Sequence, residues 1–240
     1  MAGLGTATAA CLLAATGASA SFHEMKIREV SSGTGTPDSS YVEVQMYAPG
    51  QTFLSFGAKL VRCDSTCSSP TTFQGFTNAA AGANQSTVLF GDSGVPSRDF
   101  STDLNLNAIE AGGAVCYLSE PGFSDCMSWG NFSANTTLMA NYGTGAGTPA
   151  PALSSGMVLR RSIAAGCPTL LESGDDTDNS AADFSLATPN PRNNASPPTE
   201  MPCGAAKAKK KCKKKHKKSG STPYSAKKHK CKKKHHRAVA

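Results

Sequence analysis

Two neighbouring stretches decide the fold class: FHEMKIREV at residues 22–30 and YVEVQMY at residues 41–47. Apolar and polar side chains alternate along the first stretch, and the second is rich in β-branched and aromatic residues. A period of two residues is typical of a strand that buries one face, and β-branched and aromatic residues favour strands. Residues 31–40 between them are rich in Gly, Ser and Thr, which indicates a loop. The two stretches therefore predict two β-strands joined by a loop.

Short strand-like clusters continue along the chain. The further candidates are residues 56–63, 71–76, 87–90, 104–106, 114–118, 127–132, 157–161 and 183–187. Turn residues separate these clusters, and runs of strong helix formers are missing. Short strands that recur about every 8–12 residues predict an all-β fold, and specifically a β-sandwich. Residues 79–86 and the Gly/Pro/Ala-rich residues 135–155 are expected to be loops.

Charge divides the chain into an acidic body and a basic tail. Residues 203–240 contain fifteen lysines, one arginine, four histidines and no acidic residue, so this tail carries +16. The rest of the chain carries −9, and the whole chain carries +7. Residues 188–202 contain five prolines and no apolar run, which predicts a partly extended linker. The charge density of the tail predicts that it is disordered on its own.

The first twenty residues resemble an export signal. Residues 9–15 (AACLLAA) form a short apolar run, and Ala18-Ser19-Ala20 is an A-x-A cleavage motif. The run is shorter than the ~20 apolar residues that span a bilayer, so we expect no integral membrane segment. We therefore expect a signal peptide at residues 1–20, a domain at 21–187 and a secreted protein. An Ala-rich leader and a lipoprotein signal at Cys11 are the alternatives.

Cysteine usage also favours export. Eight cysteines follow the expected signal peptide, and an even number in an exported chain indicates disulfides. Position along the chain suggests three pairs: Cys63 with Cys67, Cys116 with Cys126, and Cys167 with Cys203. The first pair would clip a hairpin tip, the second would cross two strands, and the third would tie the end of the body. Reduced thiols in a cytosolic protein are the alternative.

Several short motifs of the body resemble bacterial lamin-tail-type domains. The motifs are IREV (27–30), YVEV (41–44), SFGAKL (55–60), GGAV (112–115), SGMVLRR (155–161), DDTDNSAADF (175–184) and TPNP (188–191). They span most of the body, and the last two together are the most specific. The resemblance implies an immunoglobulin-like β-sandwich. Such domains occur in secreted and surface proteins, alone or attached to hydrolases, and act as binding or structural modules.

Candidate chemistry in the body is sparse. Asp175, Asp176 and Asp178 lie in an acidic loop that could hold calcium through oxygen ligands, although the same residues serve as turn residues. His23 is the one histidine of the body, and its position among apolar residues argues against a catalytic base. Glu24 and Glu29 are carboxylates that could act as acid and base, but nothing in the sequence places them in a cleft. We expect no catalytic residue and no cofactor.

The tail is the strongest functional signal. Its cationic residues predict binding to a polyanion, with an affinity that falls steeply with salt. They are Lys207, Lys209, Lys210, Lys211, Lys213, Lys214, Lys215, Lys217, Lys218, Lys227, Lys228, Lys230, Lys232, Lys233, Lys234 and Arg237. The near-repeat of 211–216 at 230–235 pairs Cys with His twice, which offers a zinc site or a Cys212–Cys231 disulfide as alternatives. A merely solvated tail is the alternative to polyanion binding.

We therefore expect a monomeric, non-enzymatic, secreted protein that the tail holds on an anionic cell-wall polymer. Three rival functions remain open. The tail could bind nucleic acid without sequence specificity, since its single aromatic residue, Tyr224, provides little base stacking. The body could be an exported hydrolase with an unrecognised site, or a calcium-stabilised adhesion module.

Overall fold

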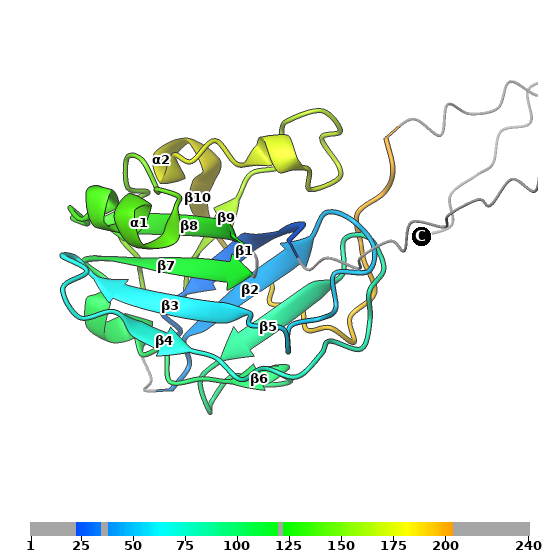
Figure 1. Cartoon of the computed structure of the whole chain (residues 1–240), viewed down its shortest axis with the longest axis horizontal. Coiled ribbons are helices and arrows are strands. Elements are labelled where there is room, and N and C mark those ends of the chain that lie inside the picture. Colours follow the sequence, from blue (N-terminus) through cyan, green and yellow to red (C-terminus); the bar gives the residue numbers. More distant parts are fainter. Residues whose placement is uncertain (1–22, 35–37, 120–121, 204–240) are drawn as a thin grey trace, which may run out of the picture. The chain divides into compact units, whose positions relative to one another are not determined.

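The computed structural model describes residues 23–34, 38–119 and 122–203, which form two β-sheets with little helix (Figure 1). One sheet has six strands in the order β10-β9-β1-β2-β5-β6, and the other has four in the order β4-β3-β7-β8. The strands are β1 (Met25–Ser31), β2 (Tyr41–Met46), β3 (Lys59–Asp64), β4 (Thr71–Phe73), β5 (Thr87–Gly91), β6 (Phe100–Ser101), β7 (Gly112–Ser119), β8 (Phe123–Gly130), β9 (Val158–Arg161) and β10 (Phe184–Ala187). The prediction of a mostly β protein is confirmed.

The main core lies between the two sheets. Ile27 and Phe90 from the six-stranded sheet pack in the same cluster as Tyr117 and Trp129 from the four-stranded sheet, and all four side chains are buried. Alternation explains this arrangement, because every second residue of β1 and β7 points to the same side. The two stretches that predicted the fold form β1 and β2, which pair antiparallel with Ile27 opposite Val44.

The structure corrects the prediction of a strand at residues 104–106. Leu104 and Leu106 are both fully buried, but Asn105 between them has a φ of 45°, which breaks an extended chain. Leu106 begins a short 3₁₀ helix, η1 (Leu106–Ile109). The strand of this region is the short β6 instead, and it pairs parallel with β5.

Residues 135–155 were predicted to be a loop, but they begin with the helix α1 (Asn135–Tyr142). Leu138 is its one buried residue, so the sequence has no amphipathic pattern from which a helix could be predicted. Gly143 ends the helix with a φ of 73°, a conformation that glycine adopts without strain. The remaining helices are η2 (Ser173–Asp175) and α2 (Ser180–Asp183).

Residues 188–203 form a C-terminal strap along the body, although 188–202 were predicted to be a linker. Asn194 is 6% exposed, and its side chain donates to the carbonyls of Ala81 and Thr87 at 2.9 Å each. It also accepts a hydrogen bond from the N–H of Ala81 at 2.6 Å. Proline-rich sequences favour extended chain, and here the polar side chains between the prolines fix that chain to the body.

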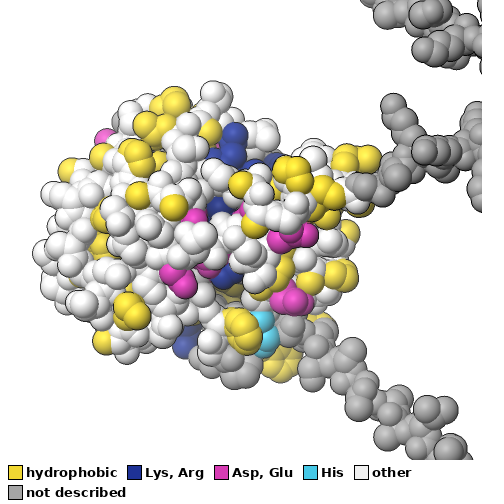
Figure 2. All heavy atoms as spheres, turned by 90° about the horizontal axis from the view of Figure 1, so that it is seen from above, with side chains coloured by type: hydrophobic (Ala, Val, Ile, Leu, Met, Phe, Trp, Pro, Cys, Tyr) yellow, Lys and Arg dark blue, Asp and Glu magenta, His cyan; other side chains and the backbone are white. Residues whose placement is uncertain are grey.

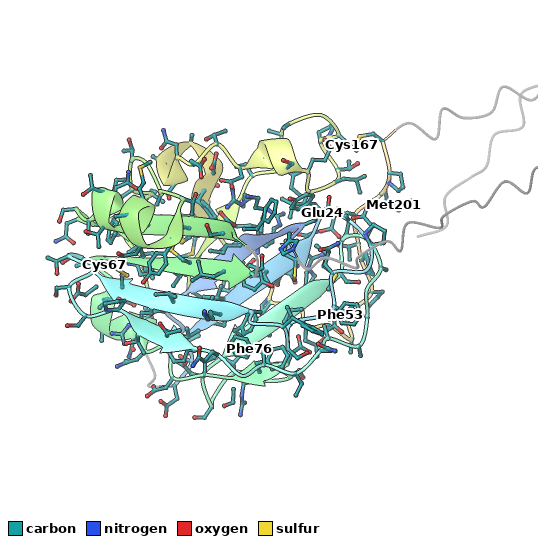
Figure 3. The ribbon with its side chains drawn as sticks, in the orientation of Figure 1. Glu24, Phe53, Cys67, Phe76, Cys167 and Met201 are labelled. Carbon is teal, nitrogen blue, oxygen red and sulfur yellow. A yellow bond between two sulfur atoms is a disulfide. The ribbon has the colours of Figure 1, made fainter. Side chains whose placement is uncertain are left out.

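The three expected disulfides are present in the structure. They join Cys63 to Cys67, Cys116 to Cys126 and Cys167 to Cys203, with sequence separations of 4, 10 and 36 residues. Figure 3 shows Cys167 and Met201 at one end of the body and Cys67 at the opposite end. Three disulfides indicate an oxidising compartment outside the cytoplasm. The described residues contain no helix that is long and apolar enough to cross a membrane.

Candidate functional site

An outer groove of about 580 Å³ lies on the four-stranded sheet. It lies on the face of that sheet that points away from the main core. Its walls come from β3, β4, β7, β8 and the C-terminal end of α1 (Figure 1). The volume falls within the ~300–1,000 Å³ that is typical of small-molecule sites. We define the outer groove by Lys59, Thr72, Gln74, Phe123, Asn141 and Tyr142.

The outer groove exists because α1 covers only part of this face. Leu138 of α1 packs into a second apolar cluster on the outer face, together with the Cys116–Cys126 and Cys63–Cys67 disulfides. The helix ends at Gly143 and leaves the rest of the face open. Ser124 Oγ of β8 donates to the carbonyl of Tyr142 at 2.7 Å, which fixes the end of the helix as one wall.

The floor of the outer groove follows the register of the sheet. Leu118 of β7 stands opposite Lys59 of β3 and opposite Ser124 of β8. The Cys116–Cys126 disulfide lies in the neighbouring cross-strand row, since these two residues are directly paired. Hydrogen-bonded neighbours and a covalent crosslink hold the floor in one shape, so a ligand would meet a preformed surface.

The lining combines aromatic rings with uncharged polar groups. Phe123 is 55% exposed, although it is a large apolar side chain, and Tyr142 is half-buried. Gln74, Asn141 and Thr72 add amide and hydroxyl groups that both donate and accept hydrogen bonds. Within the part of the lining that the structure describes, Lys59 is the one charged side chain, and no carboxylate or histidine takes part.

Ser119 and His23 are in contact at the edge of the outer groove. The sequence alone did not predict this contact. The hydroxyl of Ser119 lies 3.2 Å from Nδ1 of His23 and 3.2 Å from the carbonyl oxygen of Phe123. A carbonyl only accepts, so when the Ser119 hydroxyl donates to Phe123, Nδ1 of His23 can only donate to that hydroxyl. A catalytic serine needs the opposite arrangement, in which the histidine accepts the hydroxyl proton. This geometry favours a structural role for the pair.

The three calcium candidates already have partners within the protein. Asp175 accepts the N–H groups of Ala164 and Ala165 at 2.7 and 2.8 Å through one oxygen, and that of Glu172 at 2.8 Å through the other. Asp178 accepts a hydrogen bond from the Thr144 hydroxyl at 2.7 Å. Among the described residues, no three or more Cys, His, Asp or Glu side chains are grouped to hold a metal ion. The geometry favours turn residues over calcium ligands.

Asp176, the remaining calcium candidate, belongs to a buried ion cluster around Arg161. The guanidinium of Arg161 contacts both oxygens of Asp125 at 2.8 Å, Asp176 at 3.1 Å and Asp183 at 3.5 Å, and its side chain is fully buried. Lys26 reaches Asp176 at 2.5 Å. Burial works to raise the pKa of Asp176, yet the charges of Arg161 and Lys26 outweigh it and lower the pKa to about 2.

A second ion cluster holds the C-terminal strap on the outer side of the six-stranded sheet. Arg192 of the strap pairs with Glu43 of β2 at 3.1 Å and with Glu200 at 2.8 Å. Burial raises the pKa of Glu43 to about 7, against the opposing effect of Arg192. On the face drawn in Figure 2, acidic and basic side chains likewise lie near one another among uncharged polar groups.

The pair of carboxylates that could act as acid and base does not share a cleft. Glu29 is buried, pairs with Arg160 at 2.7 Å and accepts a hydrogen bond from the hydroxyl of Tyr41. Glu24 is exposed and accepts from the side chain of Gln51 at 3.3 Å. The two carboxylates make separate ion-pair and hydrogen-bond contacts and do not form a common reaction centre.

The cationic residues of the tail, and the Cys/His pairs at 211–216 and 230–235, lie outside the described residues. Cys203, at the start of the tail, is described and is bonded to Cys167 of the body. We found no match to this chain among protein-family models, curated proteins or solved structures. Residue chemistry and geometry therefore carry the functional argument alone.

Proposed function

We propose that this chain is an exported, non-enzymatic binding or display protein. Its cationic tail holds it on an anionic polymer of the cell surface, with cell-wall polymer as the first choice. The division of charge carries this proposal. The tail concentrates +16 in 38 residues without one acidic side chain, whereas the rest of the chain carries −9. Lysines at this density release many counterions from a polyanion and bind it without sequence specificity.

The attachment of the tail to the body supports a tethering role. The Cys167–Cys203 disulfide fixes the last described residue before the lysines. Arg192 and Asn194 fix the preceding strap to the six-stranded sheet through side-chain hydrogen bonds. Tension on the tail would therefore reach the body through a covalent bond rather than peel the strap from its sheet. Such a clamp is what a surface-bound domain needs.

The body of the proposed protein is a lamin-tail-type domain with an immunoglobulin-like topology. Two mostly antiparallel sheets around one core support this proposal, as do the motif residues that lie in β1, β2 and β9. The Ser119 hydroxyl contacts the Phe123 carbonyl as well as His23, and with its proton on that carbonyl it is not activated by the histidine. A binding role accounts for these features better than a hydrolytic one.

Fractionation of the producing cells tests the tether. The full chain is compared with a chain that ends at Gly204, which keeps the Cys167–Cys203 disulfide, and with a matched control that carries serine at each tail lysine and at Arg237. We expect the full chain to stay with the envelope and to elute with salt, and both altered chains to appear in the medium. Equal partitioning of all three would refute the tether. Retention on DNA but not on wall polymer at about 0.15 M salt would favour the nucleic-acid alternative.

A further inference from the structure

We propose that the outer groove binds an uncharged stretch of a carbohydrate chain. The body would then bind a carbohydrate. This rests on the proposed function in one respect, namely that the body binds the carbohydrate and does not cleave it. It does not depend on the tail. None of the residues that define the outer groove belongs to either ion cluster or to the strap.

Phe123 provides the surface that a sugar ring would cover. Its ring is 55% exposed at the mouth of the outer groove. His23 stacks on it with 4.8 Å between the ring centroids, which steadies the ring while much of it remains open. Sugars present a face of C–H groups with hydroxyls at the rim, and such a face packs on the electron-rich face of an aromatic ring. An exposed phenylalanine beside polar groups suits this amphipathic ligand.

The polar groups of the outer groove match a ring of hydroxyls. Each hydroxyl of a sugar both donates and accepts, and the side-chain amides of Gln74 and Asn141 do the same. Both amides come from exposed positions, one just after β4 and one on α1. Thr72 adds a hydroxyl to the lining. A purely apolar partner would leave these groups unpaired, which costs binding free energy.

The charge of the lining argues against the other common ligands. Among the described residues of its lining there is no carboxylate to bind a cationic peptide or a metal ion. Its single lysine, Lys59, falls short of the clusters of Arg and Lys that bind phosphate-rich polymers. A neutral polyhydroxylated chain is the class that agrees with this lining. The rigid floor, crosslinked by the Cys116–Cys126 disulfide, limits the ordering that binding would require.

Calorimetric titration of the full mature chain with neutral oligosaccharides tests the inference. The probes are the tetrasaccharides of β-linked glucose, β-linked N-acetylglucosamine and α-linked mannose, at about 0.5 M NaCl, where charges of the tail are screened. We expect at least one probe to bind, and Phe123→Ala and Asn141→Ala each to weaken it about tenfold or more. Phe56→Ala is the matched control, because Phe56 is an exposed phenylalanine, at 67%, outside the outer groove.

Gln74→Ala keeps the test decisive if Phe123→Ala unfolds the protein. Gln74 is exposed and supports no core contact, so this variant is expected to melt like the parent and to bind more weakly. Absence of binding to all three probes at millimolar concentration overturns the inference, as does binding that survives both Asn141→Ala and Gln74→Ala. Release of new reducing ends from a bound probe would instead refute the proposed non-enzymatic function, whereas the proposal of a carbohydrate ligand would survive.

Discussion

Replacement of Arg161 by methionine probes the buried ion cluster. Methionine fills a similar volume but leaves Asp125, Asp176 and Asp183 in place with Lys26 as their remaining cation. Removing one partner of a buried ion pair costs about 3–5 kcal/mol, because the other charge stays buried without compensation. For a domain of this size we expect the midpoint of thermal unfolding to fall by roughly 6–20 °C at pH 7.

The loss should depend on pH in a defined direction. The pKa of Asp176 is about 2 in the folded state, below its ordinary value of 3.8, so its ion pairs stabilise the fold above pH 4. This contribution of about 2 kcal/mol disappears as the pH falls from 4 to 2. Arg161→Met has already lost most of it at every pH. The gap between the parent and the variant should therefore be full at pH 7 and narrow towards pH 2.

Thermal unfolding at pH 7 and urea unfolding across the pH range, both followed by the fluorescence of Trp129, measure the two effects. Trp129 is the single tryptophan and is fully buried, so its emission reports the loss of the core. Arg160→Met is the matched control: this neighbour lies on the same strand, has a 27% exposed side chain and pairs with one carboxylate. A loss in Arg161→Met no greater than in Arg160→Met would refute the reasoning, and so would a gap that stays constant between pH 7 and pH 3.

Three further outcomes follow from the strap, the disulfides and the acidic loop. Burial raises the pKa of Glu43 from 4.5 to about 7, so this group should lower the free energy of unfolding by about 3 kcal/mol as the pH rises from 4.5 to 7. Glu43→Gln should remove this pH dependence of the free energy of unfolding, measured in urea. An unchanged pH dependence would contradict the assignment. Replacing Cys167 and Cys203 by serine opens a loop of 36 residues and should lower the free energy of unfolding by about 4 kcal/mol. The same double change at Cys116 and Cys126, which close a shorter loop, should lower it by about 3 kcal/mol. A smaller loss of stability for the longer loop would argue against a chain-entropy origin. Chelation of calcium should leave the melting temperature unchanged, because protein donors occupy Asp175, and a clear drop would revive the calcium site.

Local patterns made the strands and two of the disulfides predictable. Alternation at residues 22–30 marks β1, and the direct pairing of Cys116 with Cys126 follows from a hairpin whose turn lies between them. α1 was not predictable, because NTTLMANY forms a helix only where Leu138 can fill the apolar cluster on the outer face. Here tertiary packing decided a segment whose own propensities are weak.

The strap and the outer groove escaped prediction for a related reason. The sequence of residues 188–202 resembles a linker, and some of its hydrogen-bond partners, such as Ala81 for Asn194, lie more than a hundred residues away along the chain. The outer groove draws its lining from β3, β4, β7, β8 and α1, so no local motif connects Lys59 with Tyr142. Only the stacking of these segments in three dimensions brings the side chains together.

The tail and the outer groove would hold the same matrix by contacts that respond differently to salt. Lysines bind a polyanion through counterion release, which weakens as salt rises, whereas aromatic stacking and neutral hydrogen bonds depend little on salt. Under the two proposals, binding through the tail would raise the effective concentration of the outer groove near a glycan-bearing polymer, and the Cys167–Cys203 bond ties the start of the tail to the body. Neither contact then needs to be tight alone. In this arrangement high salt should release the full chain from a purely anionic polymer, yet leave residual, Phe123-dependent retention on a polymer that also carries neutral sugars.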